Sequence, residues 1–288
     1  MKDEFSRLYP AVGFAYFALV LTFAMWFTNP LFQAISLAAA FAYSIYLRGG
    51  RAVRTDFLTL VPLMLVTALL NPCFSHQGVT TLAYLPSGNP LTEESIFYGL
   101  SAGAMLAGTI CWFSCLNEVL TSDKFVYLFG RTAPALSVLL SMTLRFVQRF
   151  NRQLRRVSSA RRASGGRQTV GEALSVFSGV TGWAMENAVE TADSMKCRGW
   201  GLGGRTAYSC FRFDGRALGW LGFIVADGAF IIFCKLTGAL YWRYYPSVKG
   251  SFTALTFCAA AAYAALCLAP LAADLLEDGK WNVLRSEL

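Results

Sequence analysis

The sequence predicts an all-α, polytopic membrane protein with about six transmembrane helices and two long amphipathic cytoplasmic helices. Charged residues make up only 15% of the 288 residues and hydrophobic residues make up 55%, whereas about 25% of the residues of a soluble domain are charged. The apolar residues are also gathered into blocks. A block of about 20 residues is long enough for a helix that crosses a bilayer.

Six apolar blocks mark the predicted spans. The fifth contains Asp227 and Lys235, and the third continues without a charge as far as Phe74; the other four are free of charge throughout. The first block is too long for the core of a cleaved signal peptide, and no small-residue cleavage site follows it, so we expect a retained span. The six blocks are 11–28, 31–47, 57–70, 95–117, 217–240 and 252–273.

The basic residues predict the orientation of the spans. Fifteen Lys and Arg residues lie in 121–216 and three lie in 48–54, whereas 71–94 contains none. Basic loops stay on the cytoplasmic side of a membrane, so both chain ends are expected there and the net charge of +8 records topology and contact with anionic lipid. The predicted regions are therefore 1–120 with four spans, 121–216 as a cytoplasmic domain, and 217–288 with two spans and a cytoplasmic C-terminus.

The first half of the cytoplasmic region predicts one helix over about 134–163. Pro134 suits the first turn of a helix, and the Gly residues after Ser164 are typical of a C-terminal cap. Apolar residues recur every three or four positions, which indicates an amphipathic helix, and arginines form a second stripe. The apolar stripe is Leu136, Leu140, Leu144, Val147, Phe150, Leu154 and Val157, and the basic stripe is Arg145, Arg149, Arg152 and Arg156.

The second half predicts a similar helix over about 170–197, stopped by Gly199 and Gly201. It has an apolar stripe and an acidic stripe. The acidic stripe is either a solvated face or the partner of the arginine stripe, and the sequence leaves both readings open. The apolar residues are Val170, Leu174, Phe177, Val180, Ala184 and Ala188, and the acidic residues are Glu186, Glu190 and Asp193.

Each predicted helix thus ends with small residues, arginine and glycine. A small residue allows the helix end to approach another surface, the planar guanidinium of Arg suits a carboxylate, and Gly ends the helix bluntly. Two such ends could fit two matching grooves on a symmetric or pseudo-symmetric partner. The alternative is that Arg198 only interacts with the dipole of its own helix, which contributes about 0.3–1 kcal/mol.

Several other groups are expected to be structural. Asp227 in a span is a candidate for an ion relay, but a lone carboxylate favours pairing with a nearby cation, and Lys235 can extend to the membrane surface. Glu93 and Glu94 are typical of a helix start.

The Gly residues of 201–204 follow a helix, which disfavours a phosphate-binding loop, and no Walker A motif occurs. The eight cysteines form no Cys-x-x-Cys pair, so we expect no metal site.

Motifs along most of the chain resemble one family. The segments 71–79, 121–125 and 144–147 resemble its outer loop and the lead into its first coupling helix, and Met195-Lys196-Cys197-Arg198-Gly199-Trp200-Gly201 followed by Gly204-Arg205-Thr206 resembles the end of its second coupling helix. The chain thus resembles the transmembrane T component of energy-coupling factor importers, ABC-type transporters that include the cobalt-transport permease. Cys197 stands where the family has Ala. In the first motif Ser164 stands where the family has Arg, so Arg161 or Arg162 would take over.

The resemblance implies a non-catalytic subunit without a cofactor or metal, in the cell membrane of a prokaryote. It implies that two ABC-type ATPase subunits receive the two helix ends, while a separate substrate-binding S component takes up a vitamin or metal ion. An ion-coupled secondary transporter would need more polar groups within the spans. A membrane-anchored scaffold whose basic arm binds nucleic acid would need interleaved aromatic residues. The candidate coupling residues are Ala160, Arg161, Arg162, Ala163, Ser164 and Gly165, and Cys197, Arg198 and Gly199.

Overall fold

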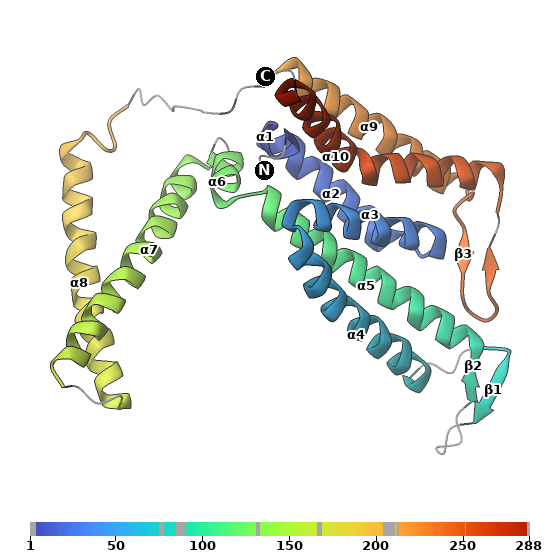
Figure 1. Ribbon diagram of the computed structural model, residues 1–288, viewed down its shortest axis with the longest axis horizontal. Helices are drawn as coiled ribbons and strands as arrows, with labels where there is room; N and C mark the ends of the chain where they lie inside the picture. Colours follow the sequence, from blue (N-terminus) through green and yellow to red (C-terminus); the bar gives the residue numbers. More distant parts are fainter. Residues whose placement is uncertain are drawn as a thin grey trace. The chain divides into compact units, whose positions relative to one another are not determined.

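The computed structural model describes residues 4–74, 78–84, 90–130, 133–165, 169–203, 211, 213–250 and 252–286. These residues form ten helices and two short β-hairpins (Figure 1), so the all-α prediction is confirmed. The chain divides into two compact units. One combines residues 1–121 with 211–288, and the other is Ser122–Cys210, which covers most of the predicted cytoplasmic region.

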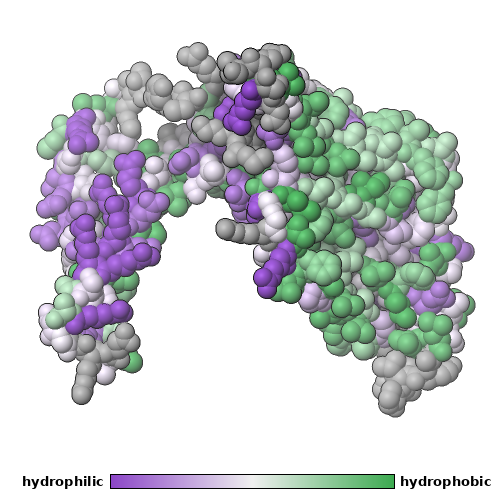
Figure 2. Space-filling model, in the orientation of Figure 1, coloured by the Kyte–Doolittle hydropathy of each residue, from purple (hydrophilic) through white to green (hydrophobic). Residues whose placement is uncertain are grey.

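Five helices of the first unit are long and apolar enough to cross a membrane. They are α3 (Pro30–Arg48), α4 (Gly50–Phe74, apolar from Val53), α5 (Glu93–Val119), α9 (Gly215–Leu236) and α10 (Ala254–Ser286). Figure 2 shows the hydrophobic surface that covers this unit. The protein is therefore a multi-pass membrane protein.

The first predicted span, 11–28, is the shorter helix α2 (Pro10–Trp26). Its 17 residues span about 25 Å, less than the roughly 30 Å of a bilayer's hydrocarbon core. The helix stops early because Asn29 caps the next one, accepting a hydrogen bond from the Leu31 backbone N–H at 3.0 Å.

Helix α2 contributes much of the core of this unit. Val12, Tyr16, Phe17 and Val20 are fully buried. The Tyr16 hydroxyl donates to the backbone carbonyl of Leu266 in α10 at 3.1 Å. The rings of Tyr16 and Phe17 also lie edge-on to Trp112 of α5. Helix α2 therefore contacts both α5 and α10.

A partly buried ion pair fixes the turn between α3 and α4. Gly49, with φ of 70°, is the single break between the helices, so α4 begins inside the basic segment expected as a turn. The guanidinium of Arg48 lies 3.0 Å from the Asp56 carboxylate, and the Ser44 hydroxyl donates to the same carboxylate. Asp56 is 7% exposed, so one carboxylate holds the two helices together at this end.

Both α9 and α10 differ in length from the predicted blocks. Helix α9 ends at Leu236, before Gly238 with φ of 78°, and is followed by strands β3 (Trp242–Arg243) and β4 (Lys249–Gly250). Helix α10 continues past its apolar part to Ser286, and two of its acidic residues contact other helices. Asp278 accepts from the Tyr46 hydroxyl of α3 at 2.6 Å. Asp274 accepts from the Phe5 backbone N–H of α1 (Glu4–Arg7) at 3.0 Å.

The loop between α4 and α5 contains a second hairpin. Strands β1 (Thr81–Tyr84) and β2 (Pro90–Thr92) pair antiparallel. As predicted, α5 starts with Glu93 and Glu94 in its first turn. The Glu94 carboxylate also accepts from the Thr80 hydroxyl at 2.7 Å, so it ties the hairpin to the helix start.

The two ionisable residues of α9 differ in their surroundings. The Lys235 ammonium group donates to the backbone carbonyl of Trp26 at 3.1 Å, and its Nζ lies 3.9 Å from the centre of the Trp26 indole ring. This arrangement fits the predicted extension to the membrane surface. Asp227 has no ion pair among the described residues, and no described donor reaches its Oδ2. The cation partner expected for Asp227 is therefore not found in the described part of the chain.

The described residues of the second unit form three helices. They are α6 (Ser122–Gly130), α7 (Pro134–Ala163) and α8 (Val170–Cys197). The bounds of α7 and α8 confirm the two predicted helices. Helix α6 is short, and the sequence analysis did not identify it.

Candidate functional site

Helices α7 and α8 form an antiparallel pair, and Figure 1 shows them crossing. Val176 and Val180 of α8 are buried in this unit. The rings of Phe146 and Trp183 stack with their centres 6.3 Å apart. The guanidinium of Arg161 near the end of α7 donates to the Ser175 hydroxyl near the start of α8 at 2.8 Å. The end of α7 therefore lies beside the beginning of α8.

The end of α8 is a glycine-terminated cap of the Schellman type. Gly199 has φ of 79° and donates its N–H to the Lys196 carbonyl at 2.9 Å. The Trp200 N–H donates to the Met195 carbonyl at 3.0 Å. These two hydrogen bonds satisfy carbonyls that a helix end leaves unpaired. The cap fixes the backbone of Arg198, and both Cys197 and Arg198 are exposed.

The end of α7 repeats this backbone geometry. Ser164 has φ and ψ of −82° and 10°, and Arg198 has −84° and 9°. Gly165 has φ of 81° and donates to the Arg162 carbonyl at 3.2 Å, as Gly199 does to the carbonyl three positions earlier. Ser164 therefore occupies the backbone position of Arg198, and Gly165 that of Gly199. This equivalence is the alignment expected from the sequence motifs.

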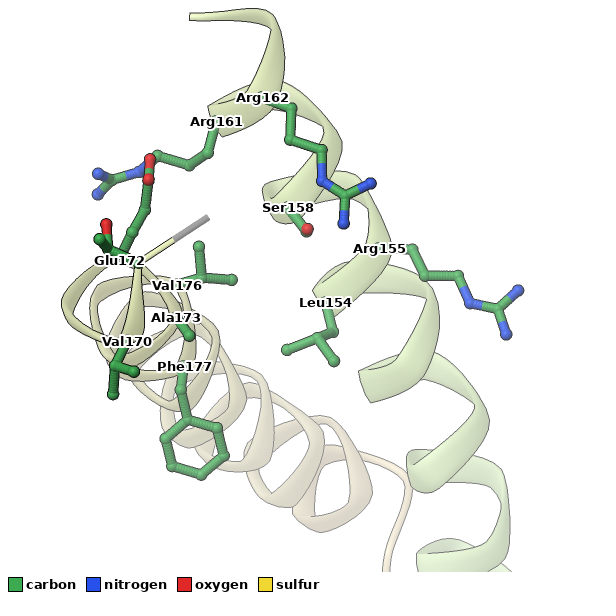
Figure 3. A pocket seen from close by; sticks show the side chains of 11 residues that line it. Leu154, Arg155, Ser158, Arg161, Arg162, Val170, Glu172, Ala173, Val176 and Phe177 are labelled. Carbon is green, nitrogen blue, oxygen red and sulfur yellow. The ribbon is translucent and has the colours of Figure 1, made fainter. Parts of the chain in front are cut away.

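The two arginines before Ser164 leave α7 on different sides. Arg161 reaches over the first turns of α8, whereas Arg162 extends from the other side of the helix (Figure 3). Both are exposed, as are Ala160 and Ala163. The end of α7 thus presents two guanidinium groups about one turn or less before the cap.

The two helix ends lie far apart. Because Arg161 contacts Ser175, the end of α7 lies near the start of α8, and 22 further residues of α8 lead to Cys197. At 1.5 Å per residue these residues span about 33 Å along the axis. The two ends therefore point to opposite ends of the pair and can contact two separate partner sites.

The charged stripes of the pair are exposed and do not meet. Among the described residues no ion pair joins an arginine of α7 to an acidic residue of α8, and the one contact of the acidic stripe is Asp193 with Lys196 at 4.0 Å. Figure 2 shows hydrophilic surface gathered on this unit. Of the two readings for the acidic stripe, the structure favours the solvated face. The exposed members are Arg145, Arg149, Arg152 and Arg156, and Glu186, Glu190 and Asp193.

A groove between the end of α7 and the start of α8 is a feature that sequence reasoning missed. Leu154, Val170 and Phe177 of the groove belong to the predicted apolar stripes, whereas Ala173 and Val176 do not. The groove forms only where the two helices meet, so no pattern within either segment identified it. Eleven described residues line it: Leu154, Arg155, Ser158, Arg161, Arg162, Thr169, Val170, Glu172, Ala173, Val176 and Phe177.

Among the described residues no group of three or more His, Cys, Asp or Glu side chains could hold a metal ion. The exposed groups at the two helix ends are guanidinium groups, which suit carboxylates and phosphates.

A comparison with protein-family models finds none that matches the chain, and a comparison with curated proteins finds no match either. The structure by itself shows a polytopic helical membrane protein with five candidate spans and a separate unit of three helices.

Proposed function

We propose that the chain is the coupling subunit of an energy-coupling factor importer. In this proposal it does not hydrolyse ATP. Two cytoplasmic ABC-type ATPase subunits bind the two helix ends, and a separate membrane subunit binds the vitamin or metal ion. The chain lies in a prokaryotic cell membrane with both ends in the cytoplasm.

One observation supports this function best, namely the repeated cap at opposite ends of one packed helix pair. A single helix end with Arg and Gly would be an ordinary C-terminal cap. Two ends with the same backbone conformation, about 33 Å apart along α8, suit a dimer of related subunits. Movement of the two partner subunits toward each other would then act on both ends of the same pair.

An exposed apolar stripe on α8 provides a route for that movement. In this unit it remains open to solvent, although α7 covers Val176 and Val180 nearby. Apolar side chains that stay exposed in an isolated subunit indicate a contact with a partner. We assign this stripe to the substrate-binding subunit. Its large members outside the end of the pair near Arg161 are Leu174, Met185 and Val189, which are 64–69% exposed.

The experiment is co-purification from native membranes followed by assays of ATP hydrolysis and substrate uptake. The variants are Arg198→Glu and the double variant Arg161→Glu/Arg162→Glu. Each reverses charge at one exposed helix end and leaves the buried contacts of the pair in place. We expect an ATPase pair to co-purify with the wild-type chain, and each variant to release it or to uncouple hydrolysis from uptake.

A matched control reverses charge elsewhere on the same pair. Arg149→Glu lies in the exposed basic stripe, away from both caps. It should leave the ATPase pair bound. Normal transport by the Arg198→Glu variant would mean that Arg198 is only a helix cap and would refute the proposal for this end.

A further inference from the structure

The groove at the α7 end gives the two helix ends different surfaces. We propose that this groove receives an apolar side chain of one ATPase subunit, which stands beside a carboxylate of the same subunit. The α7 end would then be a socket, whereas the α8 end inserts its own arginine. The inference rests on the proposed function and defines the chemistry of one of its partners.

The floor of the groove is apolar and open. Leu154 of α7 and Ala173 and Val176 of α8 face the space between the two helices (Figure 3). Val176 is 9% exposed, whereas Phe177 at the side is 56% exposed. Along α7 the groove extends from Leu154 to Arg161, which is about 10 Å. This length matches one or two side chains from a partner.

The rim carries an excess of positive charge. Arg155, Arg161 and Arg162 line the groove, against the single acidic residue Glu172. None of these four forms an ion pair with another described residue. Arg161 is held over α8 by its hydrogen bond to Ser175. A guanidinium that is already positioned loses less conformational freedom when it binds a carboxylate. The positive charge of the rim therefore favours an acidic side chain of the partner beside the apolar side chain that enters the groove.

The cap residue itself cannot provide this contact at the α7 end. Ser164 occupies the position of Arg198, but its hydroxyl turns back and donates to the Ala160 carbonyl of its own helix at 3.1 Å. The short side chain therefore does not extend forward. Recognition at this end is left to the groove and to the arginines one turn earlier.

Three variants and a crosslink test the socket. The ATPase subunits that co-purify with the wild-type chain are purified, and their affinity is measured on the full chain in lipid nanodiscs. Ala173→Phe fills the floor, and Arg162→Glu reverses the rim charge without adding bulk to the floor. Ser178→Phe adds the same ring at an exposed position of α8 outside the groove. A photo-crosslinking residue at position 173 then identifies the contact.

We expect Ala173→Phe and Arg162→Glu each to weaken binding of the ATPase subunits by about tenfold or more. Loss of a central interface contact has an effect of this size. Ser178→Phe should bind within about twofold of the wild type. The crosslink should reach an apolar residue beside Asp or Glu on one ATPase subunit. Circular dichroism of each variant checks that the helices persist.

Two results would overturn the socket and leave the proposed function in place. One is wild-type affinity of both groove variants while Arg198→Glu is impaired. The other is a crosslink from position 173 to lipid or to the substrate-binding subunit. Failure of the wild-type chain to bind any ATPase would instead refute the proposed function, and the socket with it.

Discussion

Replacement of Gly199 by alanine tests whether the cap at the end of α8 fixes the helix end. Gly199 has φ of 79°, and a Cβ there would lie 3.1 Å from the Cδ1 of Leu202, a flexible side chain that can move. The cost therefore comes mainly from the backbone, because a left-handed conformation costs an alanine about 1–2 kcal/mol. We expect the two capping hydrogen bonds, at 2.9 and 3.0 Å, to open more often by the corresponding factor of about 5–30.

Hydrogen–deuterium exchange of the peptide 195–203 measures this opening without any partner protein. In the Gly199→Ala variant the amides of this peptide should exchange about 5–30 times faster than in the wild type. Gly203→Ala is the control, because its φ is not positive and nothing lies within 4 Å of an added Cβ. Equal exchange rates in the wild type and the Gly199→Ala variant would refute the argument that glycine is needed here.

Three further substitutions test the packing. Asp56→Ala leaves the guanidinium of Arg48 without its carboxylate, so the chain in detergent should lose about 1–3 kcal/mol of unfolding free energy, and a second change, Arg48→Met, should restore much of it. Val180→Asp places a carboxylate in the contact between α7 and α8, so spin labels on the two helices should move apart, whereas Val189→Asp at an exposed site should leave their distance unchanged. Tyr16→Phe removes the hydrogen bond to α10 and should cost about 1 kcal/mol, and an unchanged unfolding transition would argue against that bond.

The helices of the second unit were predictable because local signals act within them. Pro134 at the start of α7, and Gly165 and Gly199 after the ends of α7 and α8, fix boundaries through backbone chemistry alone. The amphipathic stripes were visible for the same reason. What the stripes contact was not predictable, since the separation of the acidic and basic faces depends on the crossing of the two helices.

The first unit was less predictable in its details. In a membrane helix both the core face and the lipid face are apolar, so composition did not distinguish α2, which has fully buried residues, from a span that mainly faces lipid. The contact of α10 with α1 joins Asp274 to the backbone N–H of Phe5, 269 residues away in the chain, so no local pattern predicted it. The groove beside Arg161 likewise arises from two helices together, and neither segment predicts it alone.

The position of α2 has a consequence for how the chain is made. Its 17 residues leave the ribosome before those of α10, and the acceptors of the Tyr16 hydroxyl, in Leu266 and Cys267, follow about 250 residues later. A helix that is short for the bilayer and carries such a hydroxyl is held weakly until its neighbours arrive. The packing of α2 is therefore completed only when α10 has entered the membrane. A chain truncated before α10 should leave α2 accessible to protease, although every residue of α2 is still present.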